Sequence, residues 1–395
     1  MAPAATRPPD DEAKRRGSRR ARTPPAAAGS GKTEKMKPTT VRTERPVHDA
    51  SKVTPPDWFV EAVDAPVESL RVRVEPGVAV HCLRWGASAS KRGVVLVHGG
   101  GASAVWWRFV APFFQDDLDV VAVSQSGCGE SDFKEKYSVE DWGSEISAVC
   151  DALGFFAPDR PKPYIVAHSM GGAVAHCHLV REAESAPDRD SKFGGFVMID
   201  TAIRNPETAR LVKERVLEMR RGDPTMEIRP GWPRNPDSVT PLERFKLRPY
   251  QACDQIYLLK FIAEGSVVRF PDRTWSWRGD ANRDAKLDWD FPDLHDENLA
   301  VVAERMPVAW IYGEQSVLCD ASVVEHARKS LAGRIGVVAV PRCGHHVWLD
   351  NPLAVVTAIR GVFAGWASIP FKDGPGVVDD EDDRLNRLAK LESKL

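Results

Sequence analysis

The sequence predicts an α/β fold, in which a mostly parallel eight-stranded sheet is flanked by helices and carries an inserted, mainly helical cap. Short β-branched apolar runs recur along the chain, and their lack of polar alternation is typical of strands buried on both faces of a parallel sheet. Helical stretches lie between these runs, and such strand–helix–strand repetition indicates a doubly wound architecture. The repetition stops only between residues 202 and 295, which indicates an insertion.

Residues 1–54 are predicted to form a disordered basic tail rich in Pro and Ala. Almost no large aliphatic residue precedes Val41, so the segment cannot bury enough apolar surface to offset the entropy lost on ordering. The basic run at residues 14–22 fits a solvated tail, a nuclear signal, a nucleic-acid-binding arm or an organelle presequence. Acidic residues at positions 10–12 argue against the presequence, because transit peptides contain few acids.

The α/β core is predicted to occupy residues 55–201 and 296–368. It begins with a hairpin, since apolar residues alternate on both sides of the turn Glu75-Pro76-Gly77. The other strands are the apolar runs at residues 94–97, 120–123, 164–167, 196–199, 308–312 and 335–340. Helices are predicted at residues 139–153, 172–181, 321–331 and 353–363.

The insertion at residues 202–295 is predicted to be a cap over the carboxyl edge of the sheet, where ligands bind in open α/β folds. Its aromatic residues either line a substrate pocket or pack within the cap; they include Tyr250, Tyr257, Trp275 and Trp277. Beyond the core, residues 369–395 are predicted to form an acidic linker and a short C-terminal helix with leucines along one face.

Composition and charge argue against several classes of protein. With 43% hydrophobic residues, 28% charged residues and a formal net charge of −2, the 395-residue chain has the balance of a globular protein, and nucleic acid binding is not indicated. No run approaches the roughly 18 to 20 apolar residues of a membrane span, and no apolar signal core lies near the N-terminus. Seven cysteines without a Cys-x-x-Cys pair indicate reduced thiols. We therefore predict a cytoplasmic location, with organelle targeting by the tail as the alternative; the oligomeric state is not indicated.

Ser169 is the predicted nucleophile. It lies between the apolar run 164–167 and a helical stretch, within the sequence Ala167-His168-Ser169-Met170-Gly171. At such a turn between a strand and a helix the serine Oγ is exposed, and the helix N-terminus faces the reacting carbonyl. The alternative is that Ser169 only caps the helix.

A glycine-rich loop, His98-Gly99-Gly100-Gly101, follows the strand predicted at residues 94–97. Glycines directly after a buried strand leave backbone N–H groups free to point at a developing oxyanion. Gly100 and Met170 are predicted to donate these N–H groups. A phosphate-binding loop is the alternative, but no Gly-Lys-Ser/Thr follows and no acidic ribose partner is obvious.

His345 is the predicted general base, and Asp200 is the first choice for the acid that orients it. The sequence Cys343-Gly344-His345-His346 follows the last predicted strand, from which a histidine can reach over the sheet edge to the serine. His346 is the alternative base, although the residue after Gly344 has the freer backbone. Asp200 directly follows the run 196–199, and Glu314 and Asp320 are the second and third choices. The chain order of serine, acid and histidine holds for all three.

The sequence His176-Cys177-His178 has the residue types of a metal site. Residues two apart on a helix face in different directions, so one ion cannot be held by both imidazoles. We predict neither a metal nor a cofactor.

Together these motifs make the chain resemble the α/β-hydrolase superfamily over roughly residues 68–368. Residues 126–132 are similar to the family's Gly-x-Gly-x-Ser-Asp signature, and Gly344-His345 with Asp350 and Pro352 is similar to its Gly-His…Glu-x-Pro ending, which favours His345. Residues 124–132, 244–247 and 275–277 look like those of a group of capped bacterial members.

The resemblance bears on the acid and on the reaction. Ser316 stands where an aspartate is usual in this architecture. In haloalkane dehalogenases and pancreatic-type lipases, relatives on the same fold, the acid can follow the sixth strand, which supports Asp200. Dehalogenases and epoxide hydrolases of this fold use an aspartate nucleophile, so Ser169 argues against those two reactions.

The expected function is that of a serine hydrolase cleaving an ester or related acyl bond of a small molecule through an acyl-enzyme. One alternative keeps the same triad but cleaves a carbon–carbon bond or a lactone. Another is a non-catalytic receptor of the same fold, in which the pocket binds a small molecule. The sequence does not indicate the natural substrate or the acyl-chain length.

Overall fold

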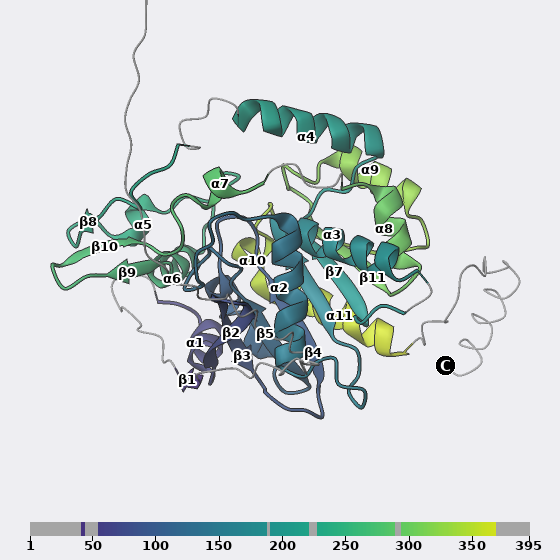
Figure 1. Cartoon of the computed structure of the whole chain (residues 1–395), viewed down its shortest axis with the longest axis horizontal. Helices are drawn as coiled ribbons and strands as arrows, with labels where there is room; N and C mark the ends of the chain where they lie inside the picture. The colour runs from purple at the N-terminus through teal and green to yellow at the C-terminus, as the bar shows by residue number, and fades with distance from the viewer. Residues whose placement is uncertain (1–40, 44–53, 188–189, 221–226, 289–293, 369–395) are drawn as a thin grey trace, which may run out of the picture. The chain divides into compact units, whose positions relative to one another are not determined.

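The structure, a computed structural model, describes residues 41–43, 54–187, 190–220, 227–288 and 294–368. Its main sheet has the strand order β1-β2-β3-β5-β4-β6-β7-β11-β12 (Figure 1). These strands are β1 Val41–Thr43, β2 Glu68–Glu75, β3 Val78–Trp85, β4 Arg92–Val97, β5 Leu118–Val123, β6 Tyr164–His168, β7 Gly195–Ile199, β11 Val308–Gly313 and β12 Gly336–Val340. From β5 to β12 all neighbouring strands are parallel, and the β2–β3 hairpin is antiparallel. The eight predicted strands are confirmed.

A ninth strand, β1, lies within the segment predicted to be a disordered tail. Its three residues pair antiparallel with β2, opposite Glu68, Ser69 and Leu70, and so extend the sheet at its edge. The other residues of that segment lie outside the described residues, apart from Thr54. The predicted acidic linker and C-terminal helix at residues 369–395 also lie outside them.

Helices cover both faces of the sheet. Those of the core are α1 Asp57–Asp64, α2 Val139–Ala152, α3 Met170–Ser185, α8 Asp296–Ala303, α9 Ala321–Ser330, α10 Val347–Asp350 and α11 Pro352–Ser368, with two short 3₁₀ helices, η1 Ala104–Trp107 and η2 Ala111–Phe114. All four helices predicted in the core are present, within a few residues of the predicted bounds.

The central strands β4, β5, β6, β7 and β11 are buried on both faces, as their apolar runs predict, whereas β12 at the edge of the sheet is partly exposed. On β4, Val94 and Leu96 join one apolar cluster with side chains of α1, α10, α11 and η1. The alternate residues Val95 and Val97 join a second cluster with side chains of α2, α3, α8 and α9. Figure 1 shows α2 and α3 side by side across the sheet. The two clusters are the two halves of the core, one on each face of the sheet.

The insertion contains helices and, in addition, a small sheet that the sequence analysis did not predict. Its helices are α4 Pro206–Arg220, α5 Pro241–Arg244, α6 Ile256–Gly265 and α7 Arg283–Lys286, and its antiparallel sheet consists of β8 Asn235–Pro236, β10 Thr274–Trp277 and β9 Val267–Arg269. The insertion is held to the core at Tyr137, whose hydroxyl donates to Asp280 Oδ2 at 2.8 Å. The Asp280 N–H in turn donates to the Gly127 carbonyl at 2.9 Å.

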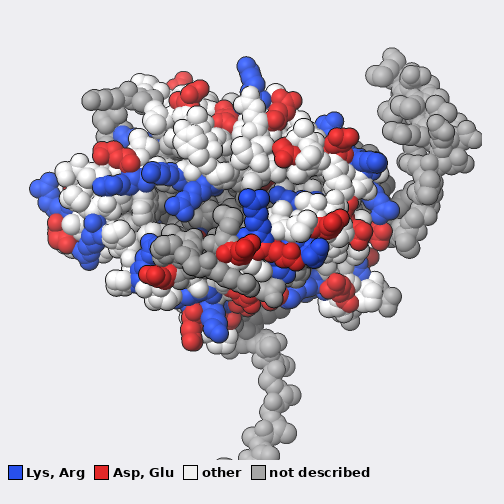
Figure 2. Space-filling view, turned by 90° about the horizontal axis from the view of Figure 1, so that it is seen from above, with Lys and Arg blue, Asp and Glu red and all other residues white. Residues whose placement is uncertain are grey.

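Charge on the surface is mixed. On the face shown in Figure 2, Lys and Arg side chains are interspersed with Asp and Glu, in keeping with a net charge of −2. No helix among the described residues is long and apolar enough to cross a membrane.

The topology brings the candidate residues to one edge of the sheet. Parallel strands have their carboxyl ends at the same edge, and β4, β6, β7, β11 and β12 are all parallel. Gly99, Ser169, Asp200 and His345 each follow one of these strands within a few residues. Segments separated by up to about 250 residues in sequence therefore meet there.

Candidate active site

Ser169 forms a sharp turn between β6 and α3. Its φ of 51° and ψ of −121° lie in a region that residues other than glycine rarely adopt, so the backbone is strained there. Its N–H donates to the Ile199 carbonyl at 2.9 Å and its own carbonyl accepts from Thr201 Oγ1 at 2.9 Å, which holds the turn against the end of β7. The side chain makes no capping hydrogen bond to α3. Helix capping therefore does not account for this serine.

Small residues after Ser169 are required by close packing. A Cβ added to Gly171 would lie 2.4 Å from the His98 carbonyl oxygen, and one added to Gly172 would lie 2.1 Å from Thr201 Oγ1. Neither position can hold a larger residue unless its neighbours move. Glycine at both positions lets α3 begin directly against the ends of β4 and β7.

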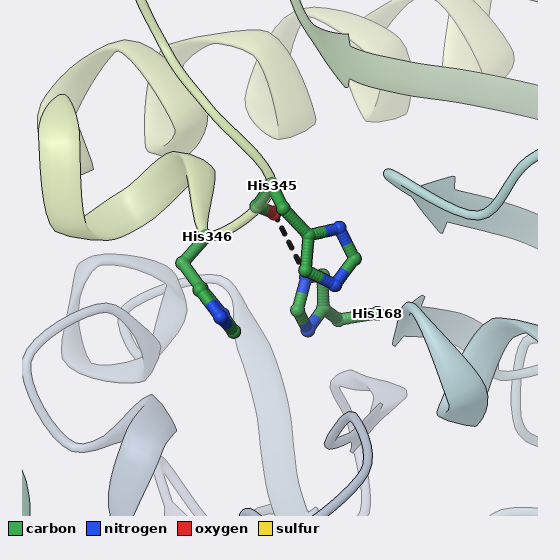
Figure 3. A group of neighbouring side chains, drawn as sticks. All are labelled: His168, His345 and His346. Atoms are coloured by element: carbon green, nitrogen blue, oxygen red, sulfur yellow. Dashed lines mark hydrogen bonds between the residues drawn. The ribbon is translucent and has the colours of Figure 1, made fainter. Parts of the chain in front are cut away.

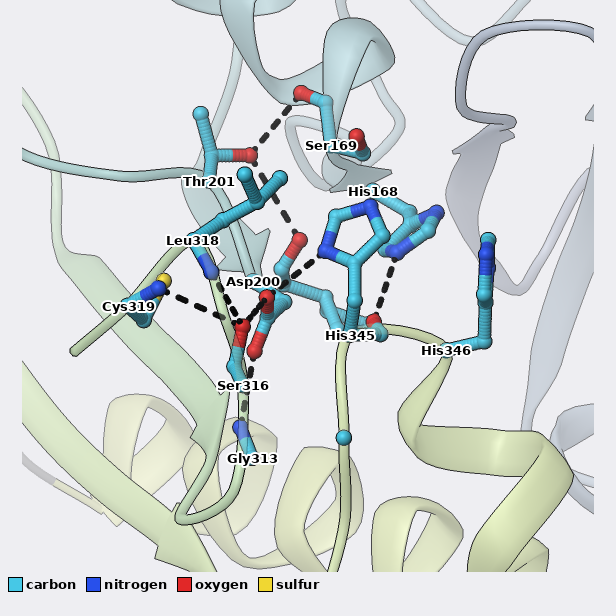
Figure 4. Close-up of polar contacts among 12 residues, drawn as sticks. His168, Ser169, Asp200, Thr201, Gly313, Ser316, Leu318, Cys319, His345 and His346 are labelled. Carbon is cyan, nitrogen blue, oxygen red and sulfur yellow. Dashed lines mark hydrogen bonds and ion pairs between the residues drawn. The ribbon is translucent and has the colours of Figure 1, made fainter. Parts of the chain in front are cut away.

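Asp200 and His345 form a buried pair. His345 Nδ1 lies 2.7 Å from Asp200 Oδ1, and the two side chains are 2% and 0% exposed (Figure 4). A carboxylate accepts hydrogen bonds, so Nδ1 is the donor in this contact, and in a neutral imidazole with its proton on Nδ1 the lone pair lies on Nε2. Figure 4 shows the Nε2 edge of the ring on the side of Ser169. The described side chains of Ser169 and His345 do not hydrogen-bond to each other, and such bonds often tighten only in the substrate complex.

The Asp200 carboxylate is held by the loop after β11. Its Oδ2 accepts from the Gly313 N–H at 2.8 Å and its Oδ1 accepts from Ser316 Oγ at 2.6 Å. Asp200 itself has a φ of 47°, a second strained position directly after a strand. These contacts fix the direction in which the carboxylate faces His345.

The other candidates for the acid lie elsewhere. Glu314 is exposed. Asp320 caps α9 by accepting from the N–H groups of Ser322 and Val323. Neither of these described side chains bonds to His345, so the geometry favours Asp200 among the three.

The glycine-rich loop lies next to the start of α3. Gly100 and Met170 line one small cavity together with Ser169 and His345, and a Cβ added to Gly100 would lie 3.6 Å from Met170 Cε. The loop is fixed by His98, which is fully buried. Its Nε2 accepts from the Gln125 N–H at 3.2 Å, so its Nδ1 carries the proton and donates to the Gly99 carbonyl at 2.7 Å. Burial lowers the pKa of His98 to about 4, which keeps this ring neutral.

The cavity in front of Ser169 has a volume of about 90 Å³. Its lining residues are Gly99, Gly100, Ala102, Trp106, His168, Ser169, Met170, Arg248, His345 and His346. A larger cavity of about 480 Å³ shares His345 with it and has polar residues in its lining, among them Gln251, Gln255 and Arg342. Gln251, from the cap, donates to Asp350 Oδ2 at 2.7 Å and accepts from the His346 N–H at 2.8 Å, so it links the cap to the loop that carries His345.

His168, His345 and His346 form a buried group of imidazoles (Figure 3), whose potential ligand atoms lie within 4.8 Å of one another. His168 Nε2 donates to the His345 carbonyl at 3.0 Å, and His345 Nδ1 is bonded to Asp200. Burial lowers the pKa of His346 to about 3 and that of His168 well below its usual range. Both rings are therefore neutral and serve as packing around His345. We assign no metal to this group.

Both the sequence and the fold of the chain are similar to those of known proteins. The model of the alpha/beta hydrolase family matches residues 94–359. The esterase Rv0045c of Mycobacterium tuberculosis is 30% identical to the chain over 294 residues, which cover 73% of this chain and 88% of the relative.

The chain belongs to the alpha/beta hydrolase family. Solved structures of the same fold include that of Rv0045c, with a TM-score of 0.53 and 23% identity over 79% of this chain and all of that one. Another is E-2-(acetamidomethylene)succinate hydrolase, with a TM-score of 0.56 and 18% identity over 75% of this chain and 99% of that one. At such identities the structures show the fold alone.

Two further sets of candidates lie outside the small cavity of this alpha/beta hydrolase. His176 and His178 belong to none of the potential metal-binding groups among the described residues, and His178 Nε2 lies 2.6 Å from Ser147 Oγ. Trp275 is fully buried and donates to the Val239 carbonyl, so it packs within the cap. Tyr257 packs against Phe59, whereas Tyr250 lines the larger cavity.

Sequence reasoning left three residues of this hydrolase without a role. His98 fixes the glycine-rich loop, His168 joins the end of β6 to the His345 loop, and Ser316 holds Asp200. Each stands next to a motif that was recognised, but its function depends on a contact made by another loop. For these three residues the sequence contained one signal: Ser316 stands where an aspartate is usual, which indicates that another loop supplies the acid.

Proposed function

We propose that this alpha/beta hydrolase cleaves a carboxylic ester or related acyl bond of a small molecule, with Ser169 as nucleophile, His345 as general base and Asp200 as the orienting acid. The observation that supports this most strongly is the buried contact between His345 Nδ1 and Asp200 Oδ1 at 2.7 Å, on the edge of the sheet where Ser169 lies. The relation to a protein named as an esterase also supports ester hydrolysis.

In the first half of the proposed reaction, Ser169 Oγ attacks the acyl carbon while His345 Nε2 takes its proton. The carbonyl oxygen becomes an oxyanion that accepts hydrogen bonds from the N–H groups of Gly100 and Met170. Asp200 stabilises the imidazolium through Nδ1. Collapse of the tetrahedral intermediate breaks the bond to the leaving alcohol, which takes the proton from Nε2.

In the second half, His345 removes a proton from water, and the hydroxide attacks the acyl-enzyme. A second tetrahedral intermediate forms in the same place and then expels Ser169 Oγ, which recovers its proton from His345. The products are a carboxylic acid and free enzyme. No cofactor enters these steps.

The proposal predicts that Ser169→Ala lowers kcat on a p-nitrophenyl ester by about 10⁶-fold, because attack by serine is lost while binding remains. The measurement is release of p-nitrophenol under saturating ester. Ser147→Ala is the matched control, since Ser147 contacts His178 on α3 and not the cavity. If Ser169→Ala kept full activity while folding normally, another residue would have to be the nucleophile. If the protein were a receptor without catalytic activity, neither the natural protein nor Ser169→Ala would hydrolyse the ester.

A further inference from the structure

The cavity in front of Ser169 is small. An apolar protein cavity of about 150 Å³ holds one benzene molecule, and the volume here is only about 90 Å³. A cavity of this size has room for about three or four non-hydrogen atoms. An acetyl or propionyl group fits such a space, whereas a hexanoyl chain does not.

Trp106 is the largest side chain of this cavity's wall. It comes from η1, directly after the glycine-rich loop, and is 5% exposed. Its ring centre lies 5.5 Å from that of His346 and 6.0 Å from that of Phe245, which belongs to the cap. The indole is thus held between the loop that carries the catalytic base and the cap.

The backbone that carries Trp106 is fixed as well. The Trp106 N–H donates to the Ser103 carbonyl at 3.1 Å, and the neighbouring Ala104 N–H donates to Ser124 Oγ at 3.0 Å. On the Trp106 side of the cavity a longer acyl chain meets the indole, whose neighbours Phe245 and His346 leave it little room to turn. Close packing makes such a movement costly.

We propose that the enzyme acts on esters of short acyl groups that lie in the small cavity, and that Trp106 sets this limit as the largest side chain in its wall. The inference rests on the proposed function, because it assumes that the acyl carbon is attacked by Ser169. Trp106 determines specificity and takes no part in the proton transfers.

The test compares p-nitrophenyl acetate, butyrate and hexanoate, which share one leaving group. In the natural protein, kcat/KM should fall at least about tenfold from acetate to hexanoate, since a misfit of even one methylene can have an effect of that size. In Trp106→Ala the order should reverse. Each methylene that enters the enlarged apolar space should then raise kcat/KM roughly fourfold, the factor that corresponds to burial of one CH₂.

Two further variants distinguish a change of specificity from a loss of folded protein. Trp106→Leu keeps an apolar side chain of intermediate size and should give an intermediate ratio of hexanoate to acetate. Trp58→Ala removes an indole that packs on Phe113 and Tyr257 and does not line the cavity, so it should leave this ratio unchanged. Because each ratio is taken within one variant, a general loss of active protein cancels.

The outcomes separate the two proposals. If no ester of any length is cleaved in a Ser169-dependent way, the proposed function is wrong and the size limit is wrong with it. If acetate is cleaved through Ser169 but hexanoate is the better substrate of the natural protein, the size limit alone is overturned. The size limit is also overturned if the ratio of hexanoate to acetate is unchanged in both Trp106 variants.

Discussion

At the scale of single residues, the site depends on two strained positions. Ser169 and Asp200 both have positive φ, and both directly follow a parallel strand. Strain of this kind costs about 1 to 3 kcal/mol per residue and persists only where surrounding contacts hold it. Here Thr201 holds Ser169, while Gly313 and Ser316 hold Asp200. At these positions the Asp200 carboxylate contacts His345, and Ser169 lines the cavity.

The acid can be tested by comparing two isosteric changes. Asp200→Asn should lower kcat by about 10⁴-fold, because an amide cannot stabilise the imidazolium and can leave the ring in the wrong tautomer. Glu314→Gln, at an exposed position of the neighbouring loop, should keep the rate within about twofold. Steady-state kinetics on one p-nitrophenyl ester gives both numbers. The reverse pattern would make Glu314 the acid.

At this scale the sequence indicated which residues to propose as the triad, but not which residues hold them in place. The chain order of serine, acid and histidine together with the strand ends pointed to Ser169, Asp200 and His345. It could not show that Ser316 would bond to Asp200, because that contact joins loops more than a hundred residues apart. The role of His98 depends in the same way on the backbone of Gln125.

At the scale of elements, α2 is joined to the loop after β5 by a buried carboxyl group. Glu145 is 3% exposed, and its Oε2 accepts from the Ser126 N–H at 2.9 Å. The Lys134 ammonium lies 3.9 Å away, too far for a hydrogen bond. Burial raises the pKa of Glu145 from 4.5 to about 7, although Ser126 and Lys134 act in the opposite direction.

This shift predicts a dependence of stability on pH. A carboxyl whose pKa is higher in the folded state stabilises the protein most below its unfolded pKa of about 4.5, and that contribution is lost as pH rises through about 7. Glu145→Gln cannot ionise. Between pH 4.5 and pH 8 the free energy of unfolding of the natural protein should therefore fall by on the order of 3 kcal/mol relative to this variant.

The measurement is urea denaturation of both proteins across this pH range. Glu61→Gln, at an exposed position of α1, is the control and should show no such change. A constant difference between the natural protein and Glu145→Gln would mean that Glu145 is not destabilised by burial.

The elements also show what periodicity can and cannot predict. Runs such as 94–97 and 120–123 are apolar and rich in β-branched residues, and they form strands. The cap strand β8 has only two residues and β9 three, so neither carries a pattern that could be recognised. Short strands of this kind form because tertiary contacts hold them, such as the bond from Trp275 Nε1 on β10 to the Val239 carbonyl.

At the scale of the whole molecule, the parallel sheet brings residues that are far apart in the sequence together at one site. Its strand order places β6 between β4 and β7, so the glycine-rich loop and Asp200 flank Ser169 on either side. β11 and β12 continue the sheet and supply Ser316 and His345. The sequence predicted the parallel sheet and the strands that the candidate residues follow, whereas the order of those strands is seen only in the structure. It could not predict the volume of the cavity, which depends on how the cap and η1 pack over the edge.

The central claim is that Ser169 is made reactive by an imidazole that comes from the far end of the core. Incubation with a fluorophosphonate, followed by mass-spectrometric mapping of peptides, tests it most directly. We expect one adduct, on Ser169, which forms in the natural protein and is lost in His345→Ala. An adduct on a different serine, or labelling of Ser169 that persists unchanged without His345, would contradict it.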